Sequence, residues 1–269
     1  MSGTATRLRT FLDAWPLAAL VEVAEAKGST PREKGAQMLV SPGAIFGTIG
    51  GGQLEFMSID RAREMLGATG EEQAILDIPL GPEIGQCCGG RVEVSIRRID
   101  AALRDALVAT AEAEDQKRPH VLVFGGGHVG HALASVFALL PVRVVVVETR
   151  ADALAGMPES TETRLTPVPE EMVRDAPAGS AFVVLTHDHA LDFLIVAEAL
   201  KREDAAYVGM IGSKTKKATF KSWYFKTAGG TQAALERLVS PIGGDAVNDK
   251  RPAVIAVLAG AEIMTALAK

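Results

Sequence analysis

The sequence predicts an α/β protein in which an N-terminal α+β domain precedes a Rossmann-like domain with a doubly wound parallel sheet. In the first half, short β-rich runs alternate with glycine loops, whereas strands and helices alternate regularly in the second half. A glycine-rich turn joins the first strand of the second half to a helix, as in dinucleotide-binding folds. Because the polar segment 114–119 ends in proline between these halves, we expect domains at residues 1–114 and 119–269.

The composition limits the classes of partner. The chain of 269 residues carries 28 basic and 33 acidic residues, so neither nucleic acid nor an anionic membrane is an expected partner. The first ten residues lack the apolar core of a signal peptide. The longest apolar run, residues 253–268, is interrupted by Glu262 and is short for a membrane span. Two adjacent cysteines make no disulfide framework, so we expect a reducing, cytoplasmic location.

Helical spacing and β-rich runs predict the elements of the first domain. Leu8, Phe11, Leu12 and Trp15 share one face of a helix. A hairpin is expected where two β-rich runs flank the turn Ser41-Pro42-Gly43. The hairpin strands are residues 36–40 and 44–49, the further strands are residues 17–27, 74–80 and 91–99, and a second helix covers residues 53–66.

Two loops of this domain suit an anion. Arg32 follows Pro31 at the end of a predicted strand, where its guanidinium fork can hold a phosphate. A solvated loop charge explains Arg32 equally well. Gly50, Gly51 and Gly52 lead into a helix whose N-terminus offers unpaired N–H groups and a positive dipole end. A tight turn with close helix packing explains these glycines at least as well.

The only cysteines of the chain, Cys87 and Cys88, are adjacent and flanked by glycine. A thiolate is a nucleophile and a soft metal ligand, so this loop can present sulfur to a bound group. Cysteines often fill apolar space instead. The neighbouring glycines provide almost no side chains for a core, which favours a functional loop.

The second domain begins with a helix over residues 100–113 and a strand over residues 121–124, and then the dinucleotide-binding fingerprint. Gly125, Gly127 and Gly130, with His128 between them, follow the strand and open a helix. Glu148 ends the next predicted strand, where a carboxylate accepts hydrogen bonds from ribose hydroxyls. This context strongly favours the fold, although such glycines also serve packing alone.

Two later strands end in polar turns at the carboxyl edge of the sheet, where ligands bind in such folds. The strand over residues 181–185 runs into His187, Asp188 and His189, which suit either metal binding or acid–base chemistry, although such histidines more often bond backbone. The strand over residues 206–211 precedes Ser213 and Lys214, a further anion-binding turn. Helices are expected over residues 191–201, after residue 214 and over residues 252–267.

Together these motifs resemble the XdhC and CoxI family of accessory proteins for molybdenum hydroxylases. The glycine fingerprint is generic, but the three motifs of the first domain are specific, and all motifs occur in family order. The loop at residues 241–245 departs from the family's continuation. The motifs are GSTPREKGAQMLV (28–40), GTIGGGQLE (47–55), GQCCGGRVE (85–93), VFGGGHVG (123–130), LTHDHALD (185–192) and VGMIGSKTK (208–216).

The resemblance implies a chaperone rather than a catalyst. Such proteins bind the molybdopterin form of the molybdenum cofactor, protect it during sulfuration and deliver it to an apo hydroxylase of the xanthine dehydrogenase type. A cysteine desulfurase is a further implied partner, and a homodimer is expected. The resemblance implies that the loop motifs contact the cofactor, and Cys88 is the expected metal ligand.

Two other functions stay open at this stage. The Rossmann-like domain can serve an oxidoreductase that uses NAD(P), although the sequence shows no set of residues typical of hydride transfer. A scaffold that bridges desulfurase and hydroxylase without touching cofactor is the third class. Because small-molecule sites often form between domains, we expect the glycine loop, the cysteine loop and the Rossmann edge to line one cleft.

Overall fold

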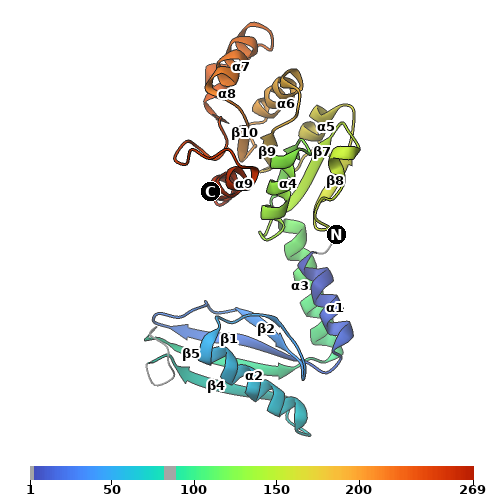
Figure 1. Ribbon diagram of the computed structural model, residues 1–269. Coiled ribbons are helices and arrows are strands. Elements are labelled where there is room, and N and C mark those ends of the chain that lie inside the picture. The colour runs from blue at the N-terminus through green and yellow to red at the C-terminus, as the bar shows by residue number, and fades with distance from the viewer. Residues whose placement is uncertain (1–2, 82–88) are drawn as a thin grey trace. The chain divides into compact units, whose positions relative to one another are not determined.

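A computed structural model describes residues 3–81 and 89–269 of the chain (Figure 1). The chain divides into two compact units, Gly3–Glu114 and Asp115–Lys269. Each unit contains its own sheet and its own buried cores. No helix in the described ranges has the length and apolar character needed to cross a membrane.

The N-terminal unit is built on a five-stranded antiparallel sheet in the order β3-β2-β1-β5-β4. Strands β2 and β3 form the expected hairpin. The strands are β1 (Ala19–Lys27), β2 (Gln37–Val40), β3 (Ile45–Gly47), β4 (Gln73–Pro79) and β5 (Arg91–Arg98), and the helices are α1 (Thr4–Ala14), α2 (Gly52–Gly67) and α3 (Ala101–Lys117).

Successive strand residues point to opposite sides of this sheet, and β4 and β5 are covered on one side only, where their alternate residues are buried. Val21 and Val23 of β1 pack in a core that includes Leu54 of α2. Leu20, which directly precedes Val21, packs instead in a core with Leu8 of α1, and α3 borders this second core (Figure 1). The N-terminal unit is therefore an α+β layer structure.

The C-terminal unit has a six-stranded parallel sheet in the order β11-β10-β9-β6-β7-β8, which is the Rossmann order. The strands are β6 (His120–Phe124), β7 (Arg143–Glu148), β8 (Glu162–Leu165), β9 (Ala181–Val184), β10 (Tyr207–Met210) and β11 (Leu238–Val239). The helices are α4 (His128–Phe137), α5 (Pro169–Arg174), α6 (His189–Lys201), α7 (Lys214–Lys226), α8 (Gln232–Glu236) and α9 (Pro252–Leu267), with a 3₁₀ turn, η2 (Asp152–Leu154).

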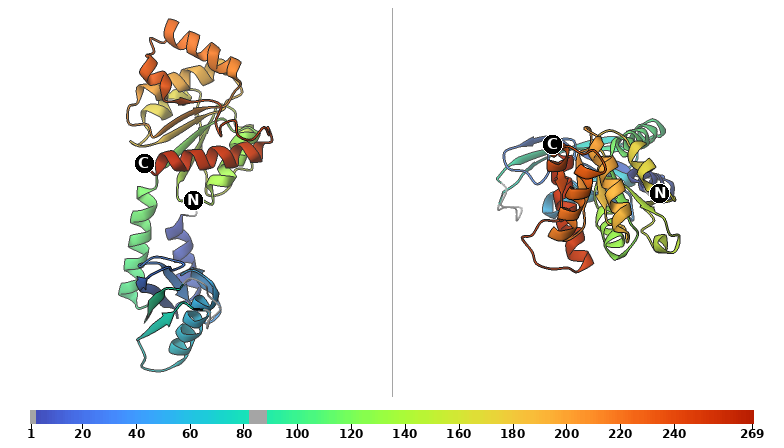
Figure 2. Two further views of the ribbon diagram at one scale, coloured as in Figure 1. Left: turned by 90° about the vertical axis from the view of Figure 1, so that its left-hand side faces the viewer. Right: turned by 90° about the horizontal axis from the view of Figure 1, so that it is seen from above.

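Helices cover both faces of the parallel sheet, as the predicted doubly wound fold requires. Val121 and Val123 of β6 pack in the core with α4 and α9, which lie side by side (Figure 2). Leu122 and Phe124 point to the other face, into the core that α5, α6, α7 and α8 complete. The predicted fold class is confirmed.

Several short elements were not predicted. Strand β8 is a largely exposed sheet edge without an apolar pattern, and the edge strand β11 has only two residues, too few to show one. Helices α5 and α8 are too short for a helical period to show. Helix α3 continues to Lys117, so most of the polar segment expected as a linker is helical.

Candidate functional site

Three motif loops meet at one end of the N-terminal sheet. Glycine at position 90 permits the first contact, because a Cβ there would lie 2.4 Å from the Ser29 carbonyl oxygen and 2.6 Å from that of Lys27. Gly28, with a φ of 74°, lies against Gly90 from the other side. The turn after β1 and the residues that lead into β5 are therefore in direct contact.

The glycine turn before α2 joins the same end of the sheet. Gly50 has a φ of 127°, and a Cβ there would lie 2.7 Å from Pro31 Cβ and 3.3 Å from Arg32 Cγ. Arg32 is exposed, and no partner for its guanidinium is present in the described part of the chain. The structure thus brings Arg32 beside the glycine turn, as a shared anion site requires.

The N–H groups of this turn are nevertheless already bonded within the chain. Glu55 Oε2 accepts the N–H of Gly51 and of Ile49, both at 3.1 Å, and the Thr48 hydroxyl at 2.6 Å. The Thr48 hydroxyl oxygen accepts the Gly50 N–H at 3.1 Å. The sequence analysis gave Glu55 no role, although a carboxylate in the first helical turn after a glycine loop is the signal for this contact. Of the groups predicted to bind an anion at this turn, Arg32 and exposed Gly52 at the start of α2 are therefore the ones that remain available.

The cysteine loop begins and ends at the same end of the sheet. Leu80 donates its N–H to the Gly90 carbonyl, and Gly89 donates to the Leu80 carbonyl, both at 2.8 Å. Cys87 and Cys88 lie outside the described residues. Among residues that are described, no three His, Cys, Asp or Glu side chains gather as a metal site would require. Metal binding by Cys88, and one cleft shared with the Rossmann edge, stay predictions.

The four glycines of the Rossmann turn (Gly125, Gly126, Gly127 and Gly130) lie in different environments. A Cβ at Gly125 would lie 2.4 Å from the Leu185 carbonyl oxygen, and one at Gly130 would lie 2.1 Å from that of Gly125. A Cβ at Gly126 would lie 2.5 Å from the Ala153 carbonyl oxygen. Gly127 alone has no atom within 4 Å of such a Cβ, and it is exposed at the N-cap of α4. Three glycines thus serve packing, and Gly127 leaves room for a ligand.

The helix that follows presents its N-terminus to the same space. His128 is its exposed first residue, and no side chain caps the helix. Free N–H groups at a helix start favour an anion. This arrangement is the one that a nucleotide pyrophosphate uses in Rossmann folds.

Glu148 ends β7 as predicted, but its carboxylate is buried and points into the protein. Its side chain is 2% exposed. Oε2 accepts the Gly126 N–H at 2.9 Å, and Oε1 accepts the N–H groups of Thr149 at 2.8 Å and Arg150 at 3.1 Å. The Arg150 guanidinium adds contacts of 3.3 and 3.4 Å. Both oxygens that were expected to bind ribose are thus bonded to the protein.

These contacts also set the acidity of the group. Burial raises the pKa of Glu148, but the Gly126 N–H, the Arg150 guanidinium and the following backbone N–H groups outweigh it and lower the pKa to about 2. The carboxylate is therefore charged throughout the physiological range. It fixes the turn of Gly125–Gly130 against β7.

At the carboxyl edge, the predicted residues lie beside a buried ion pair that the sequence analysis missed. His187 is exposed, and Asp188 caps α6 by accepting the Ala190 N–H at 2.8 Å. Asp192, fully buried, accepts the Thr186 N–H at 2.9 Å and the Nζ of buried Lys216. Two features of the sequence could have indicated this pair. Asp192 lies one helical turn after Asp188, and Lys216 belongs to the run of lysines after Ser213.

Ser213 and Lys214 follow β10, the neighbour of β9 in the sheet. The Ser213 hydroxyl accepts the Lys216 N–H at 3.2 Å and caps α7, so the serine has a structural role. Lys214 is exposed at the first position of that helix. Since β6, β9 and β10 are parallel neighbours, the turn of Gly125–Gly130 and these two polar turns share one edge.

Comparisons with known proteins agree with this architecture. Residues 17–78 match the XdhC and CoxI family, and residues 121–263 match the XdhC Rossmann domain. The uncharacterized protein YqeB of Escherichia coli is 28% identical over 261 residues, which cover 91% of this chain and 43% of YqeB, so the chain spans less than half of that relative. A crystal structure described as a xanthine dehydrogenase from Bacillus halodurans shares the fold, with a TM-score of 0.81, 16% identity and coverage of 99% of this chain and 96% of that chain. The chain belongs to the XdhC and CoxI family.

Proposed function

We propose that this protein is a chaperone for the molybdenum cofactor. It holds the molybdopterin form during sulfuration and delivers it to an apo hydroxylase of the xanthine dehydrogenase type. Family membership supports an accessory role linked to xanthine dehydrogenase. The single observation that supports cofactor binding most directly is the meeting of the three family-specific loops at one end of the N-terminal sheet.

The described residues fit the anionic end of such a cofactor. Arg32 offers an exposed guanidinium, and Gly52 begins a helix beside it. An arginine fork and a helix N-terminus both favour phosphate oxygens. The bound cofactor supplies the molybdenum centre that the hydroxylase uses. In this proposal Arg32 holds the phosphate, and Cys87 or Cys88 is needed for cofactor retention or sulfuration.

Cofactor retention tests the proposal. Anaerobic mixing with molybdenum cofactor, followed by gel filtration and quantification of bound molybdenum, should show retention by the wild type. Arg32→Gln should weaken retention about 10-fold, because it removes a charge-assisted contact to phosphate. Arg9→Gln is the matched control, since Arg9 is an exposed arginine of α1 paired with Glu112 and should leave retention unchanged.

The double variant Cys87→Ala, Cys88→Ala addresses the cysteine loop. We expect it to lose cofactor retention, or to fail in activating the apo hydroxylase after sulfuration. Normal retention together with normal activation would make the loop structural and defeat this part of the proposal. If the wild type retains no cofactor but still bridges desulfurase and hydroxylase, the scaffold function replaces the chaperone.

An NAD(P)-dependent oxidoreductase is the second candidate, because Gly127 leaves room for a nucleotide beside α4. Neither of the two tyrosines supplies this candidate enzyme with a proton donor beside the turn of Gly125–Gly130. Tyr207 is buried and donates its hydroxyl to Glu262, and burial followed by that contact raises its pKa far above the ordinary value. Tyr224 sits near the end of α7, away from the glycine turn. Turnover of a nicotinamide cofactor would favour this candidate.

A further inference from the structure

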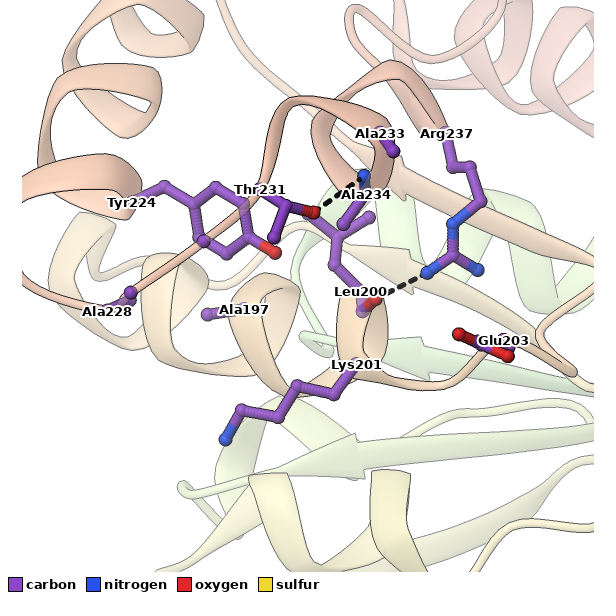
Figure 3. A pocket seen from close by; sticks show the side chains of 12 residues that line it. Ala197, Leu200, Lys201, Glu203, Tyr224, Ala228, Thr231, Ala233, Ala234 and Arg237 are labelled. Carbon is purple, nitrogen blue, oxygen red and sulfur yellow. Dashed lines mark hydrogen bonds between the residues drawn. The ribbon is translucent and has the colours of Figure 1, made fainter.

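A cavity of about 520 Å³ lies in the C-terminal unit between α6, α7 and α8 (Figure 3). One wall is formed by Ala197, Leu200 and Lys201 in the last turn of α6. The first turn of the same helix stands at the carboxyl edge with His187 and Asp188. The cavity is therefore at the opposite end of α6 from the Rossmann turn. Its volume is within the range of small-molecule sites, roughly 300–1,000 Å³.

Small residues create this space. A Cβ at Gly230 would lie 2.1 Å from the Tyr224 ring, so only glycine admits the ring at this point. Gly229 has a φ of 66°, which favours glycine for a second reason. The small residues of the lining are Ala197, Ala228, Gly229, Gly230, Ala233 and Ala234.

Tyr224 provides a hydroxyl that is available to a ligand. The residue is only 4% exposed, and its ring stacks on Phe220 with 5.2 Å between centroids. Across the described ranges, nothing forms a hydrogen bond with its hydroxyl, which borders the cavity (Figure 3). A hydroxyl that opens on a cavity and has no bond to the surrounding protein is free to donate a hydrogen bond to a ligand.

Two cations, Arg237 and Lys201, line the same cavity as that hydroxyl. Burial raises the pKa of Tyr224, and the charges of Arg237 and Lys201 act on it in the opposite direction. Arg237 donates to the carbonyls of Arg202, at 2.7 Å, and Leu200, and three of its five N–H groups stay unused by these contacts. These bonds hold the guanidinium at the rim of the cavity.

Most polar groups in the lining are donors. The Thr231 hydroxyl accepts the Ala234 N–H at 3.2 Å, which leaves its own hydrogen to donate. Lys201 adds an ammonium, which also pairs with Glu198 at 2.8 Å. Glu203 is the one carboxylate that lines the cavity. A complementary ligand therefore supplies acceptors and negative charge.

We propose that this cavity binds a small organic anion. Its carboxylate or phosphate accepts from the Tyr224 hydroxyl and lies against Arg237 and Lys201, and its apolar part covers the alanines of the lining. This ligand is distinct from the molybdenum cofactor and from a nucleotide at the Rossmann turn. The inference does not depend on the chaperone function.

Titration calorimetry with benzoate, phenyl phosphate, inorganic phosphate and neutral benzyl alcohol tests the proposal. We expect at least one of the two aromatic anions to bind, and benzyl alcohol not to bind. Comparison of benzoate with phenyl phosphate identifies the preferred head group. Inorganic phosphate should bind more weakly than phenyl phosphate, because it lacks an apolar part.

The variant Tyr224→Phe keeps the ring and removes only the hydroxyl. We expect anion affinity to fall about 10-fold or more and the melting temperature to stay equal or rise, because the lost hydroxyl has no partner in the free protein. Tyr207→Phe is the matched control, since its hydroxyl bonds Glu262 outside the cavity. It should lower the melting temperature and leave anion affinity unchanged.

Three results would overturn the proposal. They are the absence of binding by every anion, equal binding of benzyl alcohol, and equal anion affinity in Tyr224→Phe and the wild type. The last result would place the anion elsewhere, for example at the Rossmann turn. Molybdenum retention is measured separately, so its failure would leave this proposal standing.

Discussion

At the scale of single residues, the buried carboxylate of Glu148 holds together the turn that leads into α4. It accepts the Gly126 N–H from the turn and the N–H groups of Thr149 and Arg150 from its own strand end. A carboxylate with several N–H donors is more stable charged than protonated, which is why its pKa falls in spite of burial. Glu148 therefore stabilises the site rather than offering a free acceptor.

This arrangement predicts a pH-dependent stability. The pKa of Glu148 falls from about 4.5 to about 2 on folding, which corresponds to about 3 kcal/mol. A lowered folded-state pKa means that this stabilisation is complete above about pH 4.5 and is lost as the pH falls toward 2. Glu148→Gln should lower the free energy of unfolding by about 2–3 kcal/mol at pH 7, measured by urea denaturation.

The difference between wild type and Glu148→Gln isolates this group from the other carboxylates. It should shrink when the same denaturation is repeated at pH 3. The control is Glu25→Gln, whose exposed carboxylate pairs with Lys34 on the surface. A difference that is constant from pH 7 to pH 3 would show that packing, and not charge, explains the effect.

At the scale of elements, the strand–turn–helix unit of β6 and α4 contains three glycines that serve packing and one that faces open space. Gly125, Gly126 and Gly130 each face a backbone oxygen closer than 2.6 Å to a built Cβ. Gly127 faces open space and has an ordinary φ of −76°. Alanine at position 127 is therefore compatible with the fold.

We expect Gly127→Ala to fold with an unchanged melting temperature and to lose nucleotide binding, because its methyl group occupies the space that a pyrophosphate approaches. Calorimetry with NAD, AMP and the cytidine dinucleotide form of the cofactor measures the loss. Gly126→Ala is the contrasting variant and should destabilise the protein, since its Cβ would meet the Ala153 carbonyl oxygen at 2.5 Å. If the wild type binds none of these nucleotides, the turn serves packing alone.

At the scale of the whole molecule, the two units contain separate cores. The cores around Val21 and Leu20 belong to the N-terminal unit, and those around Val121 and Leu122 belong to the C-terminal unit. A core that is complete within one unit can melt on its own. We therefore expect scanning calorimetry to resolve two unfolding transitions.

The buried pair of Asp192 and Lys216 assigns these transitions. Lys216→Met leaves the Asp192 carboxylate buried without its cation, which costs about 3–5 kcal/mol, so only the transition of the C-terminal unit should move to lower temperature. Lys214→Met, on the exposed side of the same helix, should move neither transition. A parallel shift of both transitions in Lys216→Met would show that the units unfold cooperatively.

Long elements and their order could be predicted from the sequence, because apolar periodicity and glycine turns are local signals. Helix α9 begins and ends where the sequence predicts, and β5 deviates by one residue. Edge strand β8 escaped prediction, because an exposed four-residue strand is defined by its pairing with β7 rather than by its own pattern.

The sequence by itself determined the two domain types, the family and the motifs that form the loops. It also determined where Arg32, Gly127 and Glu148 stand in the chain. Only the tertiary structure decided which groups are free to bind. Glu55 and Glu148 occupy N–H groups that the sequence pattern left open, and Gly230 makes room for the Tyr224 ring beside a cavity. The physical reason is that hydrogen-bond satisfaction and packing depend on contacts between residues distant in sequence, which no local pattern contains.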